Sequence, residues 1–109
     1  MATALKNAYL DLTASLADVY TVPASTTAIV FTCQVANVDG TASVDVDVVW
    51  TDDSNADKVT YLAKTVSIPA DASLNVLAGK VVLETGDKIR AKASAASDAE
   101  LTLSIMEIS

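Results

Sequence analysis

The most suggestive group of chemically active side chains lies at three alternate positions, Asp53, Asn55 and Asp57. This spacing matches the first three ligands of a calcium-binding loop. The match then fails, because Lys58 stands where the loop needs glycine and Lys64 where it needs glutamate. Aspartate and asparagine are also common in ordinary turns, where their side chains bond to nearby backbone. We therefore expect a polar turn here and no metal site.

The other residue types that usually carry catalysis are scarce. Histidine, the commonest general base and metal ligand, is absent from the 109 residues. The one cysteine, Cys33, has no histidine to activate it and no second cysteine for a disulfide or a thiolate zinc site. It falls on an apolar strand face, so we expect a buried structural thiol. The three glycines are far apart and form no phosphate-binding loop. We expect no enzyme activity, no catalytic residue and no cofactor.

The charge balance bears on partners. Fourteen acidic residues against seven basic ones give a net charge of −7, which argues against binding a nucleic-acid backbone. The excess either serves solubility or favours a basic partner surface. There is no apolar run of about 20 residues and no secretory h-region at the N-terminus. We expect a soluble protein made in a cytoplasm, with no nucleic-acid, membrane or small-molecule partner.

The elements that must position these side chains are strands. Between Ser43 and Trp50, apolar and acidic residues alternate, so successive side chains point to opposite faces. This pattern predicts a sheet with one dry and one wet face. We expect Trp50 in the core rather than at a contact. The dry face comprises Val44, Val46, Val48 and Trp50, and the wet face Asp45 and Asp47.

The same alternation recurs along the chain, with turn signals between the segments. We expect strands over residues 6–13, 18–22, 27–38, 43–50, 59–68, 88–93 and 101–108, and a short strand over 73–77 that continues at 81–83 after Gly79. Asp39-Gly40 predicts an antiparallel hairpin between the third and fourth. Residues 15–20 are compatible with a helical turn. The fold class is all-β, an antiparallel β-sandwich or jelly-roll-like domain of about seven or eight short strands. We expect one domain over residues 1–109, with residues 1–7 as an N-terminal arm that orders against a neighbour.

Candidate interface residues are charged or aromatic. Two outward strand faces carry opposite charge, and three arrangements remain open: pairing within one sheet, solvation on two different sheets, or contact between subunits. Two tyrosines are further candidates for facing a partner. The candidates are Tyr9, Tyr20, Asp45, Asp47, Lys88, Arg90 and Lys92.

Several turn and strand motifs stand out along the chain, namely the runs at residues 20–30 (YTVPASTTAIV), 35–40 (VANVDG), 68–70 (IPA), 82–89 (VLETGDKI) and 106–108 (MEI). Together they resemble motifs of small virion structural proteins of tailed bacteriophages. The resemblance covers nearly the whole chain and implies an antiparallel β-sandwich or jelly-roll-like module. Such proteins occur as capsid decoration (cement) proteins and as neck, tail or baseplate components. No catalytic residue belongs to that pattern.

The resemblance implies a capsid decoration protein that stabilises the assembled head by bridging capsid subunits. Its expected partners are the major capsid protein and itself, as a trimer at lattice symmetry points. Its expected location is the virion, after synthesis in the bacterial host cytoplasm. One alternative is a neck, tail or baseplate adaptor of the same virion. A second is a carbohydrate-binding β-sandwich module, which needs an exposed aromatic platform from Trp50 and the tyrosines.

Overall fold

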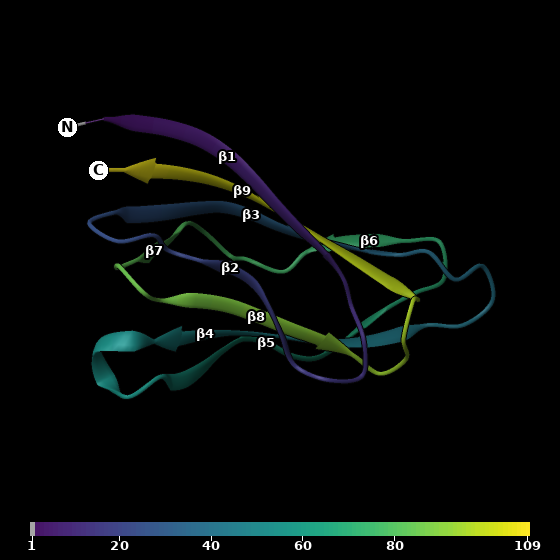
Figure 1. The fold of residues 1–109 in the computed structure, drawn as a ribbon. Helices are drawn as coiled ribbons and strands as arrows, with labels where there is room; N and C mark the ends of the chain where they lie inside the picture. The colour runs from purple at the N-terminus through teal and green to yellow at the C-terminus, as the bar shows by residue number, and fades with distance from the viewer. Residues whose placement is uncertain (1) are drawn as a thin grey trace.

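Nine strands form two antiparallel sheets in the computed structural model, which describes residues 2–109 (Figure 1). Sheet A has the order β1-β9-β3-β6, and β7 also pairs with β3; its strands are β1 (Thr3–Asp11), β3 (Thr27–Asn37), β6 (Ser73–Asn75), β7 (Val81–Leu83) and β9 (Ala99–Ile108). Sheet B has the order β2-β8-β4-β5, made of β2 (Ala17–Thr21), β4 (Val44–Asp52), β5 (Lys58–Ile68) and β8 (Lys88–Ala93). A single 3-10 turn, η1 (Asp53–Asn55), joins β4 to β5. Within residues 2–109 no helix has the length and apolar character to span a membrane.

The two sheets pack face to face, which confirms the predicted antiparallel sandwich. In Figure 1, β1, β9 and β3 run side by side in the upper part of the view, and β8, β4 and β5 in the lower part. One face of each sheet is buried against the other. The most buried side chains are aliphatic, and the largest of them are Leu12, Ile68, Leu83, Ile89, Leu101, Leu103 and Ile105.

The alternation read from the sequence correctly predicts the faces of three strands. In β4, Val44, Val46 and Val48 are buried in the core, and Trp50 packs against it. The alternate residues of β8 and β9 point inward in the same way, Ile89 to Ala93 in β8 and Leu101 to Ile105 in β9. Strands with one dry face and one wet face therefore account for most of the core.

The hairpin predicted at Asp39-Gly40 is wrong. β3 belongs to sheet A and β4 to sheet B, so the loop crosses from one sheet to the other. The buried Asn37 side chain holds this crossing, because its Nδ2 donates to the carbonyls of Ala42 and Ile68, both at 2.9 Å. A turn-forming dipeptide marks a change of direction, but it does not determine which strands pair.

Strict alternation along residues 27–38 predicts Ile29, Phe31, Cys33 and Val35 on one face, and this grouping is also wrong. Ala28 and Val30 are buried in the core in the first half of the strand, and Cys33 and Val35 in the second. The pairing of β3 with β9 shifts between Val30 and Thr32, so one extra residue is inserted. A β-bulge of this kind reverses the faces that follow it.

Two further expectations concern the N-terminal third. Residues 15–20 form no helical turn, because Ala17 to Thr21 pair with β8 as a strand. Met1 of the expected arm lies outside the described residues. Residues 3–7 are paired with β9 as the start of β1. An N-terminal arm that orders against a neighbour stays a prediction.

The inward faces of β9 should carry a large share of the stability. We expect Leu101→Ala, at a fully buried position, to lower the free energy of unfolding by about 2–5 kcal/mol through lost burial and a residual cavity. The matched control is Thr102→Ala on the outward face of the same strand, which should change it by less than about 0.5 kcal/mol. Urea denaturation measures both, and equal effects would contradict the assignment of faces.

Candidate functional site

The Asp87 carboxylate is a buried charged group whose hydrogen-bond partners all belong to the chain itself. It lies in the turn between β7 and β8, only 1% exposed, and accepts three hydrogen bonds. Its donors are the backbone N–H of Glu84 (2.9 Å), the backbone N–H of Asp53 (3.0 Å) and the indole Nε1–H of Trp50 (3.2 Å). The carboxylate therefore ties the β7–β8 turn to the end of β4.

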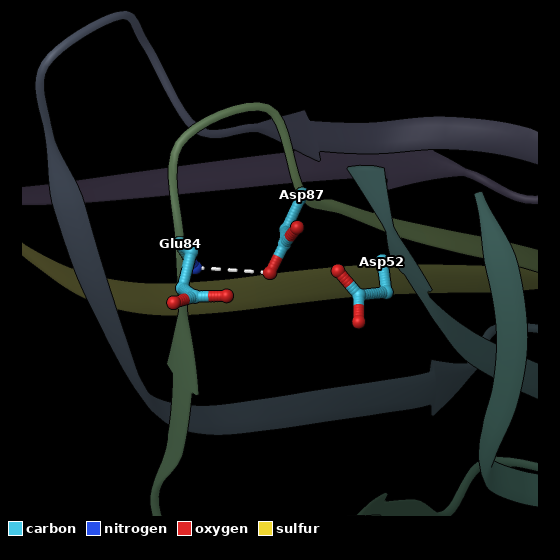
Figure 2. A group of neighbouring side chains, drawn as sticks. All are labelled: Asp52, Glu84 and Asp87. Carbon is cyan, nitrogen blue, oxygen red and sulfur yellow. Dashed lines mark hydrogen bonds between the residues drawn. The ribbon is translucent and has the colours of Figure 1, made fainter. Parts of the chain in front are cut away.

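Two other carboxylates approach Asp87, as Figure 2 shows. Oxygens of Asp52, Glu84 and Asp87 lie within 4.8 Å of one another. Asp52 caps η1, accepting from the backbone N–H of Ser54 at 3.2 Å and from its hydroxyl at 2.8 Å. Two of the three carboxylates, those of Asp52 and Asp87, already accept hydrogen bonds from the chain itself. We therefore interpret this group as structural, connecting the β7–β8 turn to the end of β4.

Sequence reasoning missed this group and singled out a different one. Of the calcium-like positions, Asp53 and Asn55 lie in η1, and Asp57 follows in the left-handed region. Gly86 is required beside them: its φ is +85°, and a Cβ there would lie 2.6 Å from Asp53 Oδ2. The run Thr85-Gly86-Asp87 is typical of a tight turn, but nothing in it indicates that the carboxylate is buried.

Asp87→Ala should destabilise the fold by about 3 kcal/mol, because it leaves two backbone donors and the Trp50 indole without their acceptor. Glu84→Ala is the matched control. It lies in the same cluster, but its side chain is exposed and the backbone donor remains, so we expect a change within about 0.5 kcal/mol. Thermal and urea unfolding compare the two, and an equally harmful Glu84→Ala would refute the role given to Asp87.

The basic residues of β8 find their partners within sheet B. Lys92 Nζ lies 3.9 Å from Asp47 Oδ2 on β4. On the other side, Arg90 Nε and Lys88 Nζ approach the Asp18 carboxylate of β2 at 2.7 and 3.5 Å. The Arg90 contact is an ion pair whose N–H is not aligned for a hydrogen bond. Of the three arrangements left open by the sequence, pairing within one sheet is therefore present, and Asp18 is the partner that the sequence did not reveal.

Contact between subunits through these charges stays a prediction. The pairs are half-exposed, and such pairs contribute about 0–1 kcal/mol each. Asp47 also has a local task, since its Oδ1 accepts from the backbone N–H of Thr65 at 2.6 Å. Thr65 has a φ of +53° at an irregularity of β5, so Asp47 stabilises that distortion. The Asp45 carboxylate is exposed on the same outer face.

The two candidate tyrosines have different surroundings. Tyr20 donates its hydroxyl to Glu107 Oε2 at 2.6 Å, and Lys6 Nζ lies 3.1 Å from the other oxygen of that carboxylate. Burial, followed by the Glu107 hydrogen bond and charge, raises the pKa of Tyr20 well above its usual value. The Tyr20 hydrogen bond and Lys6 hold the pKa of Glu107 below its usual value. Tyr9, by contrast, is 78% exposed on the outer face of β1. Of the two tyrosines, Tyr9 has the side chain that is free to meet a partner.

Cys33 is buried as predicted, with 1% of its surface exposed. Burial raises the pKa of the thiol to about 12. A protonated, enclosed thiol is a poor nucleophile.

The raised pKa of Cys33 links stability to pH. Unfolding releases the thiol proton wherever the pH lies above its ordinary pKa of 9.0 and below about 12. The contribution of the buried, protonated thiol to the free energy of unfolding is complete below pH 9 and is lost as the pH rises through that window. We expect the unfolding free energy of the wild type to fall more steeply than that of Cys33→Ala, by about 1.4 kcal/mol per pH unit. Parallel curves between pH 9.5 and 11 would contradict this.

An apolar row crosses the outer face of sheet A. Each of its residues is in register with the next across neighbouring strands. The row consists of Leu5 (β1), Met106 (β9), Ile29 (β3) and Val82 (β7). Leu5 and Val82 are 79% and 61% exposed. We call these four residues the outer row. Phe31 of β3 lies two residues from Ile29 and, together with Leu5, lines a hollow of about 440 Å³. Contiguous exposed apolar residues of this kind mark candidate interaction surfaces.

No protein-family model matches the chain, and no curated protein matches it either. Among solved structures, a chain of the acid-stable capsid of Helicobacter pylori bacteriophage KHP30 is similar, with a TM-score of 0.58 and 13% identity over 100% of this chain and 94% of that one. A chain of the Bacillus endospore appendages, described as disulfide-linked pili, has a TM-score of 0.55 and 15% identity, covering 96% and 85%.

A third likeness is to the crystal structure of the IBDV viral particle, with a TM-score of 0.59 and 5% identity. This match covers 96% of the present chain but only 30% of the viral one. What these three proteins share with the chain is the two-sheet β fold.

Proposed function

We propose that the chain is a virion structural protein, and that it decorates and stabilises an assembled phage head. The observation that carries this proposal is the likeness to the KHP30 capsid chain, which covers 100% of this chain and 94% of that one. The two chains are therefore alike in fold over nearly their full given lengths.

Strand order gives independent support. β6 and β7 pair with different halves of the same strand, β3, so together they occupy one place in the order of sheet A. The nine strands therefore fill eight places in the two sheets. The two sheets then read β1-β9-β3-β6 and β2-β8-β4-β5. We infer that this is the double-sheet jelly roll, an architecture common in viral capsid and lectin domains.

The two alternatives from other classes fit the side chains less well. A sugar-binding platform needs exposed aromatic rings, but Trp50 packs against the core and its indole is bonded to Asp87. The other exposed rings, Tyr9 and Tyr61, lie on different sheets. Assembly through disulfides, as in the endospore appendages, needs accessible thiols, whereas Cys33 is buried. We propose no enzyme activity.

The mechanism that we propose is bridging. Each copy contacts its neighbours through sheet edges and outer faces, and so adds interface area to a shell without chemistry. The partners are the major capsid protein and other copies of this chain; a trimer at lattice symmetry points stays a prediction. A neck, tail or baseplate adaptor is the second candidate, because such a subunit needs the same compact sandwich.

The proposal is tested by asking whether purified phage particles contain the chain. We expect an antibody raised against the chain to detect it in the density-gradient band of intact particles, at a copy number comparable with that of the shell protein. Particles stripped of the chain should take up purified protein and then retain their genome to a higher temperature. A copy number that fits one ring would favour the neck or tail role, and absence from the particles would overturn both.

A further inference from the structure

We propose that β1 joins two copies of this chain edge to edge, around a two-fold axis at Asn7, so that sheet A continues from one copy into the other. The inference rests on the backbone and side chains of β1 and does not depend on a role in virions.

The outer edge of β1 presents unpaired backbone groups. Among the described residues β1 pairs with β9 alone, in a continuous antiparallel register from Thr3 to Asp11. Ala2 and Ser109 exchange two backbone hydrogen bonds of 2.8 Å, and Leu12 N–H donates to Ala99. Because bonding alternates along an antiparallel strand, the even-numbered residues bond to β9. The odd-numbered residues from 3 to 11 therefore direct their N–H and C=O groups toward the open edge.

The other sheet edges of the described chain carry features that discourage pairing. β2 has five residues and a register shift between Asp18 and Tyr20, and β6 and β7 have three residues each. β5 has two irregularities, one of them at the positive φ of Thr65. Short and bulged edges are the usual protection against unwanted strand addition. β1 is different, with nine residues, an unbroken register, and no glycine or proline.

Lys6 is a charged residue that points inward from β1, and such a charge normally protects an edge. Here its ammonium lies 3.1 Å from Glu107 Oε1, so the charge is compensated within the chain. The edge thus lacks the repulsion that would keep a second strand away.

The side chains of β1 are complementary to themselves. Leu5 and Tyr9 are the two most exposed large apolar residues described, at 79% and 78%, and they flank Asn7 on the same face. A two-fold axis at Asn7 places Leu5 of each copy opposite Tyr9 of the other, an aliphatic–aromatic pair that stabilises antiparallel strands. Thr3 then faces Asp11, and Lys6 faces Ala8, so no like charges meet.

This register also uses the free backbone groups fully. The odd-numbered residues form five hydrogen-bonded pairs across the contact, and each pair exchanges two N–H···O bonds, about ten bonds in all over the nine residues. Tyr9 of the second copy extends the outer row of the first beyond Leu5. Backbone pairing and apolar contact therefore occur at the same place.

Cross-linking at the axis tests the register. In the proposed dimer the two Asn7 residues form a hydrogen-bonded pair with Cα atoms about 5.5 Å apart, a distance that suits a disulfide. We expect Asn7→Cys to give a covalent dimer under mild oxidation, while buried Cys33 stays unreactive. The matched control is Ser104→Cys, exposed on the same face of β9 and in register with Asn7. Its two copies would lie about 14 Å apart, too far to bridge. Equal cross-linking of both variants would overturn the proposal.

The mass in solution tests the contact itself. Light scattering should give twice 11.3 kDa for the wild type. Asn7→Pro removes an N–H that points to the open edge and leaves the β9 ladder intact, as proline in an edge strand can. We expect Asn7→Pro to raise the dissociation constant of the dimer about 30-fold or more, because the two copies lose two hydrogen bonds of about 1 kcal/mol each. The circular dichroism spectrum should not change. A monomeric wild type, or an oligomer that Asn7→Pro leaves intact, would refute the contact. Neither result bears on whether the chain is found in virus particles, so the two proposals fail separately.

Discussion

The burial of one face of each sheet against the other is the constraint on which the rest of the structure depends. The enclosed side chains are mostly valine, leucine, isoleucine and alanine, with no fully buried aromatic ring. Side chains of this size let two pleated sheets approach closely, so the layer between them holds few polar groups. The charges, the two exposed tyrosines and the outer row are therefore distributed over outer faces, edges and loops. The groups that are free to contact a partner therefore lie on these outer surfaces.

Buried polar side chains appear where the chain leaves that layer. Asn37 donates to two carbonyls where β3 passes over to β4. Asp87 accepts from three N–H groups in the turn between β7 and β8, and Figure 2 shows the bond from Glu84. At both places an inward polar group satisfies backbone or indole groups that no strand ladder reaches. The core contains mostly small aliphatic side chains, and where the chain leaves it, hydrogen bonds from buried polar side chains join segments that are distant in sequence.

The alternation of apolar and polar residues is a local signal, and it correctly predicted a local property, the face of a strand on which a side chain lies. The two-residue alternation of β4, β8 and β9 correctly predicted which side chains enter the core. It could not predict the bulge near Phe31, because both faces of β3 are apolar and an inserted residue leaves no mark in such a pattern. Strand pairing is not local either, so Asp39-Gly40 was taken for a hairpin and Asp18 was missed as the partner of Arg90. The buried role of Asp87 depends on donors 37 and 34 residues away in sequence.

The position of β9 has a consequence for how the chain folds. β9 lies between β1 and β3, yet it is the last of the nine strands to be synthesised. Until it arrives, the two N-terminal strands of sheet A have no common neighbour, and the partner of β1 is about ninety residues away along the chain. Loop closure over such distances makes folding slow and exposes strand edges meanwhile. Sheet A can therefore be completed only after β9 has been synthesised, by insertion of a central strand rather than by growth from one edge.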